Sequence, residues 1–304
     1  MIKYNDVIKN NFVLSPHRLQ LMEYSNKNTF KLENLLSRKL NKQDNGIDIG
    51  SNNYMKNSSY KFLKTRVANR DNYIVDLSSN ESFEFMNYNA FVQQNLKLGD
   101  ILISKDSNIG ECCILDDDYP NCMVASAFYK LPLKENKYYI FSFMKTYYFK
   151  NQLDLMVPRG ATIRHAGTKF LDCFIPFPNG KDALKIIYTI ENITKDIISK
   201  EKQIKFNENK IFEIIKNELK NNSYISNYSL PKYNELYTKN RIDAGYYCEE
   251  FKNINSLIKN YKSGFSNLND FGYEISRGQN LQVSCIGKSI ESNEYINGFY
   301  KIAK

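Results

Sequence analysis

Histidine and tryptophan are scarce in this sequence, which has two histidines (His17 and His165) and no tryptophan. The chain has six cysteines, and no two of them have the C-x-x-C spacing that is typical of zinc sites. They are Cys112, Cys113, Cys122, Cys173, Cys248 and Cys285. We therefore expect no metal centre, and we expect the adjacent pair in the apolar run CCIL to be buried thiols.

Motifs for nucleotide, methyl-donor and metal-dependent chemistry are also missing. There is no GxxxxGK[ST] loop, no G-x-G-x-x-G after a strand, and no Pro-Pro dipeptide for the (N/D/S)PP(Y/F) loop of amino-methyltransferases. The one acidic cluster, residues 116–118, precedes Pro120 and is expected to be a solvated turn. These absences favour a binding protein without catalytic residues or a cofactor.

Long hydrophobic runs are missing as well. No run of 18 apolar residues occurs, and the first residues have no signal-peptide pattern. We expect a cytoplasmic protein with reduced thiols and no membrane-spanning segment.

What the sequence does have is a basic surplus, with 42 Lys and Arg against 33 Asp and Glu, a net charge of +9. Such a surplus favours a polyanionic partner. An AT-rich genome, which increases the Lys and Asn content, would give part of the same signal.

The longest segment without Gly or Pro is residues 181–222, and it has heptad spacing. One apolar position recurs every seven residues, at Ala183, Ile190, Ile197, Ile204 and Ile211. The second position turns polar at Lys200 and Asn207. This pattern predicts a long helix that pairs with another helix as a projecting coiled-coil arm. The alternative is an amphipathic helix that lies on a globular core.

The first 178 residues are predicted to form an α+β, β-rich domain. Alternating runs predict strands at 60–67, 73–77 and 83–86, and a hairpin whose strands lie in 96–105 and 111–115. A further strand is predicted over 122–131, and the run 171–178 predicts the last one. Apolar spacing predicts helices around 30–39 and over 138–157.

The chain after residue 240 repeats features of its beginning. Residues 241–247 are similar to residues 18–24, and later matches keep an offset near 240. We therefore predict three parts: a first domain (1–178), a helical spacer (179–224), and the start of a second, incomplete α+β domain (225–304).

Three polar segments of the first domain carry residue types that suit DNA. Arg and Asn make bidentate contacts to bases, and Lys, Ser and Thr bind phosphates. The candidate DNA-binding residues are Lys64, Arg66, Asn69, Arg70, Lys105, Asn108, Arg159, Thr162, Arg164 and Lys169. Loops are polar in any protein, so each residue is a candidate only.

Four segments in order resemble the specificity (S) subunit of type I restriction-modification enzymes. They are LKLGDILISKDSNIGECCIL (96–115), RGATIRHAGTKFLDCFIPFP (159–178), the helix at 181–222, and RIDAGYYCEEF (241–251). The resemblance implies a non-catalytic subunit whose recognition domains each read half of a split duplex DNA target. It also implies spacer helices that pack antiparallel and dock modification subunits of a complex that includes restriction subunits.

The sequence departs from that family by lacking most of a second recognition domain and a second spacer helix. We expect the apolar seam of Ile190, Ile197, Ile204 and Ile211 to be covered by the C-terminal segment, by a second copy of the chain, or by a modification subunit. Two other functions stay open: the recognition part of a methyltransferase or nuclease, and a coiled-coil interaction scaffold.

Overall fold

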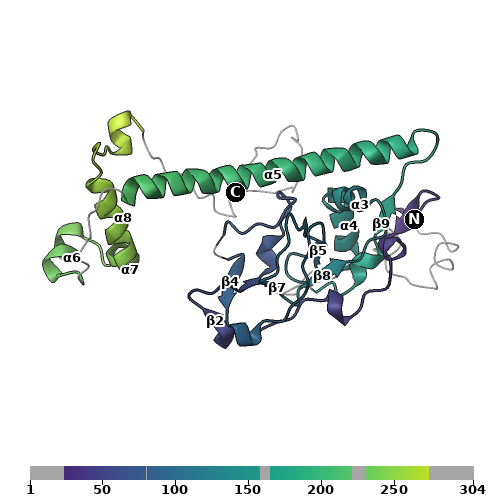
Figure 1. Ribbon diagram of the computed structural model, residues 1–304, viewed down its shortest axis with the longest axis horizontal. Coiled ribbons are helices and arrows are strands. Elements are labelled where there is room, and N and C mark those ends of the chain that lie inside the picture. Colours follow the sequence, from purple (N-terminus) through teal and green to yellow (C-terminus); the bar gives the residue numbers. More distant parts are fainter. Residues whose placement is uncertain (1–23, 80, 158–164, 221–229, 274–304) are drawn as a thin grey trace, which may run out of the picture. The chain divides into compact units, whose positions relative to one another are not determined.

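The computed structural model describes residues 24–79, 81–157, 165–220 and 230–273 (Figure 1). The chain divides into two compact units, one ending at Ile211 and one beginning at Phe212. The first unit holds all the strands that the described residues form, and a long helix follows the last of them. The predicted mixed α and β fold with a long helix is thus confirmed.

The first unit is built from three small sheets. The antiparallel pair β1–β9 joins Thr29–Lys31 to Phe174–Pro176. A mixed sheet has the order β2-β4-β3-β7, with strands Tyr54–Met55, Phe83–Met86, Lys61–Leu63 and Cys122–Val124, of which β3 and β7 are parallel. The antiparallel sheet β6-β5-β8 is formed by Cys112–Ile114, Ile101–Ser104 and Phe128–Leu131.

Single 3-10 turns connect many of these elements. In the first unit they are η1 (Leu32–Leu35), η2 (Lys42–Asp44), η3 (Ser51–Asn53), η4 (Thr65–Val67), η5 (Tyr88–Ala90) and η6 (Lys169–Asp172). Arg38 forms a bidentate pair with Asp44 in η2. Against the effect of burial, the Arg38 guanidinium and the Asn41 N–H hold the pKa of Asp44 below its ordinary value.

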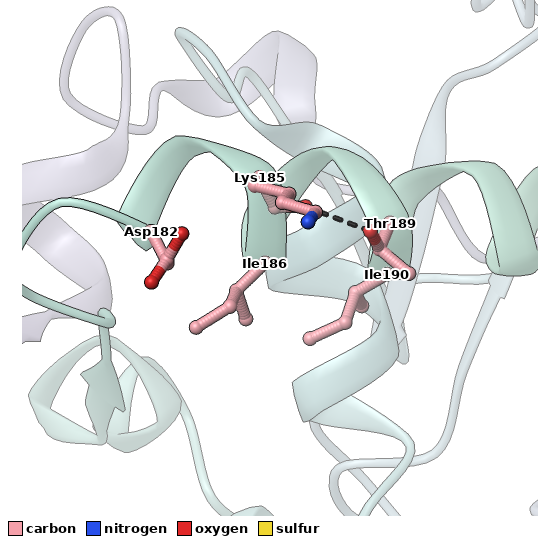
Figure 2. A pocket seen from close by; sticks show the side chains of 5 residues that line it. All are labelled: Asp182, Lys185, Ile186, Thr189 and Ile190. Atoms are coloured by element: carbon pink, nitrogen blue, oxygen red, sulfur yellow. Dashed lines mark hydrogen bonds between the residues drawn. The ribbon is translucent and has the colours of Figure 1, made fainter.

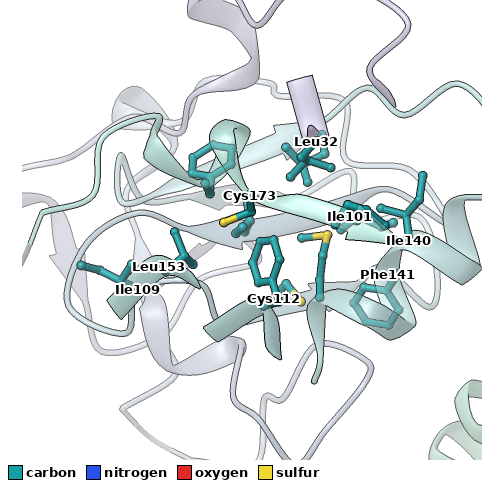
Figure 3. Close-up of a cluster of buried hydrophobic side chains, with 14 of the residues drawn as sticks. Leu32, Ile101, Ile109, Cys112, Ile140, Phe141, Leu153 and Cys173 are labelled. Carbon is teal, nitrogen blue, oxygen red and sulfur yellow. The ribbon is translucent and has the colours of Figure 1, made fainter. Parts of the chain in front are cut away.

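The main core lies between the sheet β6-β5-β8 and the helices α3 (Lys137–Met144) and α4 (Tyr147–Met156). Figure 3 shows β-strand, helix and loop side chains meeting there, among them Leu32, Ile101, Phe141, Leu153 and Cys173. Gln152 is fully buried and makes two hydrogen bonds to the backbone of Phe174, which attach α4 to β9.

The cysteines of the first unit are structural. Cys112, Cys113, Cys122 and Cys173 are buried free thiols, so the burial predicted for the first two is confirmed. Burial raises the pKa of Cys112 and of Cys113 to about 12, which keeps both thiols neutral and unreactive near neutral pH.

The helix α5 spans Ala183–Lys220 and confirms the helix predicted over 181–222. Figure 1 shows it lying along the side of the domain that carries α3 and α4. Ile187, Ile190 and Ile198 pack against the main core, and Thr194 is buried. For this part of α5 the alternative of a helix lying on a globular core is therefore the right one.

A second side of α5 stays exposed. Ile186, Ile193, Ile204 and Ile211 are 43%, 54%, 55% and 57% exposed. Steps of seven and eleven residues return to nearly the same side of a helix, so these four isoleucines form one stripe, which we call the apolar flank. Among the described residues, no helix is long and apolar enough to cross a membrane.

The described part of the second unit consists of the end of α5 and short helices. These are α6 (Tyr233–Lys239), α7 (Ala244–Tyr247), α8 (Glu249–Lys259) and the 3-10 turn η7 (Leu268–Phe271). Asp243 caps α7, and the buried Tyr247 donates its hydroxyl to the carbonyl of Arg241. The N-terminal segment that resembles residues 241–247, and the repeat matches beyond residue 273, lie outside the described residues. The predicted domain boundaries stay a prediction.

Several local predictions were wrong. Residues 30–39 form no α-helix, because Phe30 pairs with Ile175 in the β1–β9 ladder and only the 3-10 turn η1 follows. Residues 73–77 make only a single bridge, Ile74 to Ile114. The segment 138–157 is two helices, since Thr146 adopts an extended backbone between them. The run 122–131 is likewise two strands, β7 and β8, with a turn at 125–127.

Other strands are shorter than predicted. The run 60–67 is a strand only to Leu63 and then forms η4. The last strand is limited to Phe174–Pro176, because residues 169–172 form η6. The strand of 83–86 and the hairpin of β5 and β6 are confirmed.

Candidate nucleic-acid interface

The hairpin loop between β5 and β6 has a fixed shape. Ser104 and Glu111 close it through a backbone hydrogen bond of 2.8 Å, and Gly110 donates to the Ser104 carbonyl at 2.8 Å. Ser107 and Gly110 have positive φ angles of 60° and 80°. The buried Ser104 hydroxyl donates to the Asp106 carbonyl at 2.8 Å. These contacts leave Ser107 and Asn108 exposed at the tip.

The segment that follows residue 164 lies directly against this loop. Ala166 donates its N–H to the Lys105 carbonyl at 2.8 Å. His165 Nδ1 is 2.7 Å from Asp106 Oδ1, and the two residues form an antiparallel bridge. Two of the four segments of the sequence resemblance, 96–115 and 159–178, therefore meet at one place in the fold.

Two further loops complete this rim. Lys105 donates its N–H to the Ala127 carbonyl at 2.8 Å, and its ammonium group reaches Asn45 Oδ1 at 2.9 Å. Gly46 donates to the Phe128 carbonyl at 3.0 Å. We use the name loop cluster for residues 45–48, 105–111, 125–127 and 165–169. It gathers polar side chains from four distant segments at one end of the sheet β6-β5-β8.

Three predicted DNA-binding residues lie in the loop cluster, and their side chains differ in exposure. Asn108 is exposed, and its carbonyl accepts from Glu111. Lys169 is exposed and donates to the Met156 carbonyl at 3.2 Å. Lys105 is half-buried between Asn45 and the Tyr129 ring. Asn108 and Lys169 are thus better placed than Lys105 to meet a ligand.

Four more predicted residues lie around η4, and most of them are already paired. Lys64 binds Glu84, and Arg66 binds Glu81 at 2.8 Å with both side chains exposed. Asn69 organises a turn by accepting the N–H groups of residues 71 and 72. Arg70 is exposed and lies 6.0 Å from the ring centre of Tyr147.

The remaining predicted residues, Arg159, Thr162 and Arg164, lie outside the described residues. The structure therefore brings Lys105, Asn108 and Lys169 together in one cluster, and it places Lys64, Arg66, Asn69 and Arg70 in a second group at η4.

Lys145 was missed by the sequence analysis. Its ammonium group donates to the carbonyls of Asn69, Asn72 (2.8 Å) and Cys112 (3.1 Å). It thereby fixes the turn that carries Asn69 and Arg70 to the hairpin strand β6. A lysine inside the aromatic run FMKTYYF was the available signal, because buried cations need several acceptors.

The acidic residues 116–118 act as local acceptors. Asp116 accepts the Tyr119 hydroxyl at 2.7 Å, and Asp118 accepts the Leu98 N–H at 2.9 Å. The Leu98 N–H and the Lys97 ammonium hold the pKa of Asp118 below its ordinary value. Within the described ranges, no group of three or more His, Cys, Asp or Glu is arranged to hold a metal ion.

A hollow of about 390 Å³ lies beside the first turns of α5. Figure 2 shows Ile186 and Ile190 pointing to the same side there, with Thr189 donating to the Lys185 carbonyl. Asp182 and Lys185 complete its lining. The hollow therefore adjoins one end of the apolar flank.

Comparison with known proteins gives solved structures to which this chain is similar. No family model and no curated protein matches the sequence. The type I restriction-modification S subunit from M. genitalium is similar with a TM-score of 0.41 and 13% identity, over 65% of this chain and 46% of that one.

Two further solved structures are similar. A chain from a structure of complex assembly in the type I R-M system has a TM-score of 0.37 and 12% identity, over 65% of this chain and 49% of that one. The HsdS subunit from Thermoanaerobacter tengcongensis has a TM-score of 0.34 and 14% identity, over 60% of this chain and 43% of that one. The matched part spans less than half of each of the three chains.

Proposed function

We propose that this chain is the non-catalytic DNA sequence-specificity subunit of a type I restriction-modification complex. In this proposal, residues 1–178 read one half-site of a bipartite target in duplex DNA. Residues 179–224 are the spacer, and residues 225–304 begin a second recognition domain. The observation that carries the proposal is the meeting of segments 96–115 and 159–178 in the loop cluster, through the Ala166–Lys105 hydrogen bond.

The exposed side chains suit this role. Asn108 offers both a donor and an acceptor, the pattern that pairs with adenine in the major groove. Lys169 and Arg70 are exposed cations that suit phosphates. Two acidic groups of the cluster are engaged, since Asp106 contacts His165 and Asp48 accepts from Ser126. The net charge of +9 favours the same partner.

Selection of duplexes from a random-sequence library, with modification subunits added, tests this proposal. We expect one sequence motif to be enriched, and the affinity to fall by about 10³-fold between 50 and 200 mM salt if roughly six phosphates are contacted. Asn108→Ala should relax the preference at one base position by about 5- to 100-fold. Asn217→Ala, an exposed change on α5 outside the loop cluster, is the matched control.

The outcomes separate the alternatives. No enrichment of any motif by the wild-type chain with its modification subunits would contradict DNA recognition and favour an interaction scaffold. Binding of S-adenosylmethionine by the isolated chain in calorimetry would favour the methyltransferase alternative.

We further propose that the apolar flank of α5 pairs with a second helix, supplied by a second copy of the chain, and that α5 docks modification subunits. Ile186, Ile193, Ile204 and Ile211 are roughly half exposed and lie on one side of the helix. Apolar side chains on one side of a long helix are what pairing with a second helix buries. The hollow beside Ile186 and Ile190 offers space for side chains of the partner helix.

A double substitution, Ile204→Glu with Ile211→Glu, is expected to abolish this pairing, because it places two charges in an apolar contact. Light scattering should give twice the 35.6 kDa chain mass for the wild type and the chain mass for the variant. Phe206→Glu is the control, because Phe206 is exposed on the opposite side of α5. A monomeric wild type, or a dimeric double variant, would contradict the pairing.

A further inference from the structure

The carboxylate of Glu201 on α5 binds the backbone of a distant segment. It accepts the N–H of Tyr73 at 2.8 Å and the N–H of Ile74 at 3.1 Å. One turn further along the helix, the ammonium group of Lys205 donates to the carbonyl of Val75. The side chains of Glu201 and Lys205 thus bind backbone groups of three consecutive residues, as a neighbouring strand would.

This segment is buried and belongs to the framework of the candidate interface. Ile74 and Val75 are 0% and 1% exposed. Tyr73 accepts the N–H of Ile114 at 2.9 Å, so residues 73–75 lie against the hairpin strand β6. Buried N–H groups without a partner are costly, and therefore these two amides depend on Glu201.

The two charges have an order that fits only one placement of the helix. Residues four apart lie on the same side of a helix, so Glu201 and Lys205 face the segment together. Glu201 meets N–H donors and Lys205 meets a carbonyl acceptor. Rotating α5 by one residue position would turn both groups away by about 100°, and sliding it by one residue would displace both by about 1.5 Å.

A third side chain of α5 also binds the backbone of the domain. Lys202 donates to the Asp116 carbonyl at 2.7 Å, next to the C-terminal end of β6. In contrast, the apolar contacts of Ile187, Ile190 and Ile198 with the core are non-directional. The polar contacts are therefore the ones that can define the position of the helix along its own axis.

We infer that Glu201 and Lys205 are positioning residues that fix the rotation and axial position of α5 on the recognition domain, and through it the length of the spacer between DNA half-sites. The role in spacing rests on the proposed function. A slip of one helical turn moves a residue by about 5.4 Å, which corresponds to roughly one to two base pairs of duplex.

The first test measures the contact itself, by hydrogen exchange on the full chain. Glu201→Ala should speed exchange of the Tyr73 and Ile74 amides by at least about tenfold, because each loses its acceptor. Glu208→Ala, an exposed glutamate on the same helix, is the matched control and should leave both amides unchanged. If exchange of the two amides is the same in all three proteins, the inference is wrong.

The second test measures spacing, with the complex of full chain and modification subunits and a library of half-sites separated by variable spacers. The wild type should select one spacer length. Glu201→Ala should select the same half-site bases over two or three neighbouring lengths, which a mere loss of stability would not produce. One unchanged spacer length in the variant would overturn the inference.

Lys205→Met keeps the side-chain length and removes the donor, so it repeats both tests if Glu201→Ala does not fold. Broadened spacer selection by Lys205→Met supports the inference, and an unchanged length overturns it. If the wild type enriches no half-site, the proposed function fails and the spacing role with it. Faster exchange in Glu201→Ala would then still support the positioning contact.

Discussion

Replacing Lys145 by methionine is expected to lower the free energy of unfolding of the first unit by about 3 kcal/mol. Hydrogen bonds from a charged donor contribute about 1.5–3 kcal/mol each and do not add fully, and this ammonium group makes three. They reach the carbonyls of Asn69, Asn72 and Cys112. Methionine preserves the apolar stem, so the loss reports the missing donor.

Urea unfolding followed by circular dichroism measures this change. The control is Lys134→Met, because Lys134 is exposed at the domain surface and should change stability by less than about 0.5 kcal/mol. An equal, small change in both variants would contradict the role given to Lys145. The turn of Asn69 and Arg70 should also loosen, so hydrogen exchange at residues 70–72 should increase.

Gly46→Ala is expected to destabilise the same unit by about 3 kcal/mol, at the upper end of what overpacking costs. A Cβ atom at this position would lie 1.9 Å from the Ala125 carbonyl oxygen and 2.6 Å from that of Val124. Both contacts are with backbone, which cannot rotate away as a side chain can. Gly46 and Ile47 are hydrogen-bonded to Phe128 and Val124, so the loop cannot withdraw easily.

Gly50→Ala is the matched control four residues further on. Its added Cβ would meet the side-chain oxygen of Asn52 at 2.5 Å, and that flexible group can move. Thermal unfolding of both variants separates the two cases, and equal melting temperatures would contradict the backbone clash. Because Gly46 lies in the loop cluster, its variant should also weaken the DNA binding that we propose for this unit.

The sequence predicts best where one element carries its own pattern. The heptad spacing of α5 and the pattern that predicts the hairpin of β5 and β6 are local, and both led to elements that the structure contains. Leu32, Leu35 and Leu36 have helical spacing, yet Phe30 just before them pairs with Ile175 in a strand and only a 3-10 turn follows. Such distant pairings leave no mark in the local pattern.

The same distinction holds at the candidate interface. Lys105, Asn108 and Lys169 were identified as polar loop residues, and only the fold brings their two segments together. Glu201 and Lys205 look like ordinary solvent-facing residues of a charged helix, because their backbone partners lie about 130 residues earlier. Which side of α5 meets the domain, and which side forms the apolar flank, also depends on these contacts.

The pairing of β1 with β9 affects how the protein folds during synthesis. Thr29 pairs with Pro176 in that ladder, so the two strands cannot pair until Pro176 has been synthesised. At about 5–20 residues per second, the ribosome needs roughly 7–30 s to add the intervening chain. The apolar side chains around β1 stay without their final neighbours during that interval, so a chaperone that binds nascent chains should increase the soluble yield.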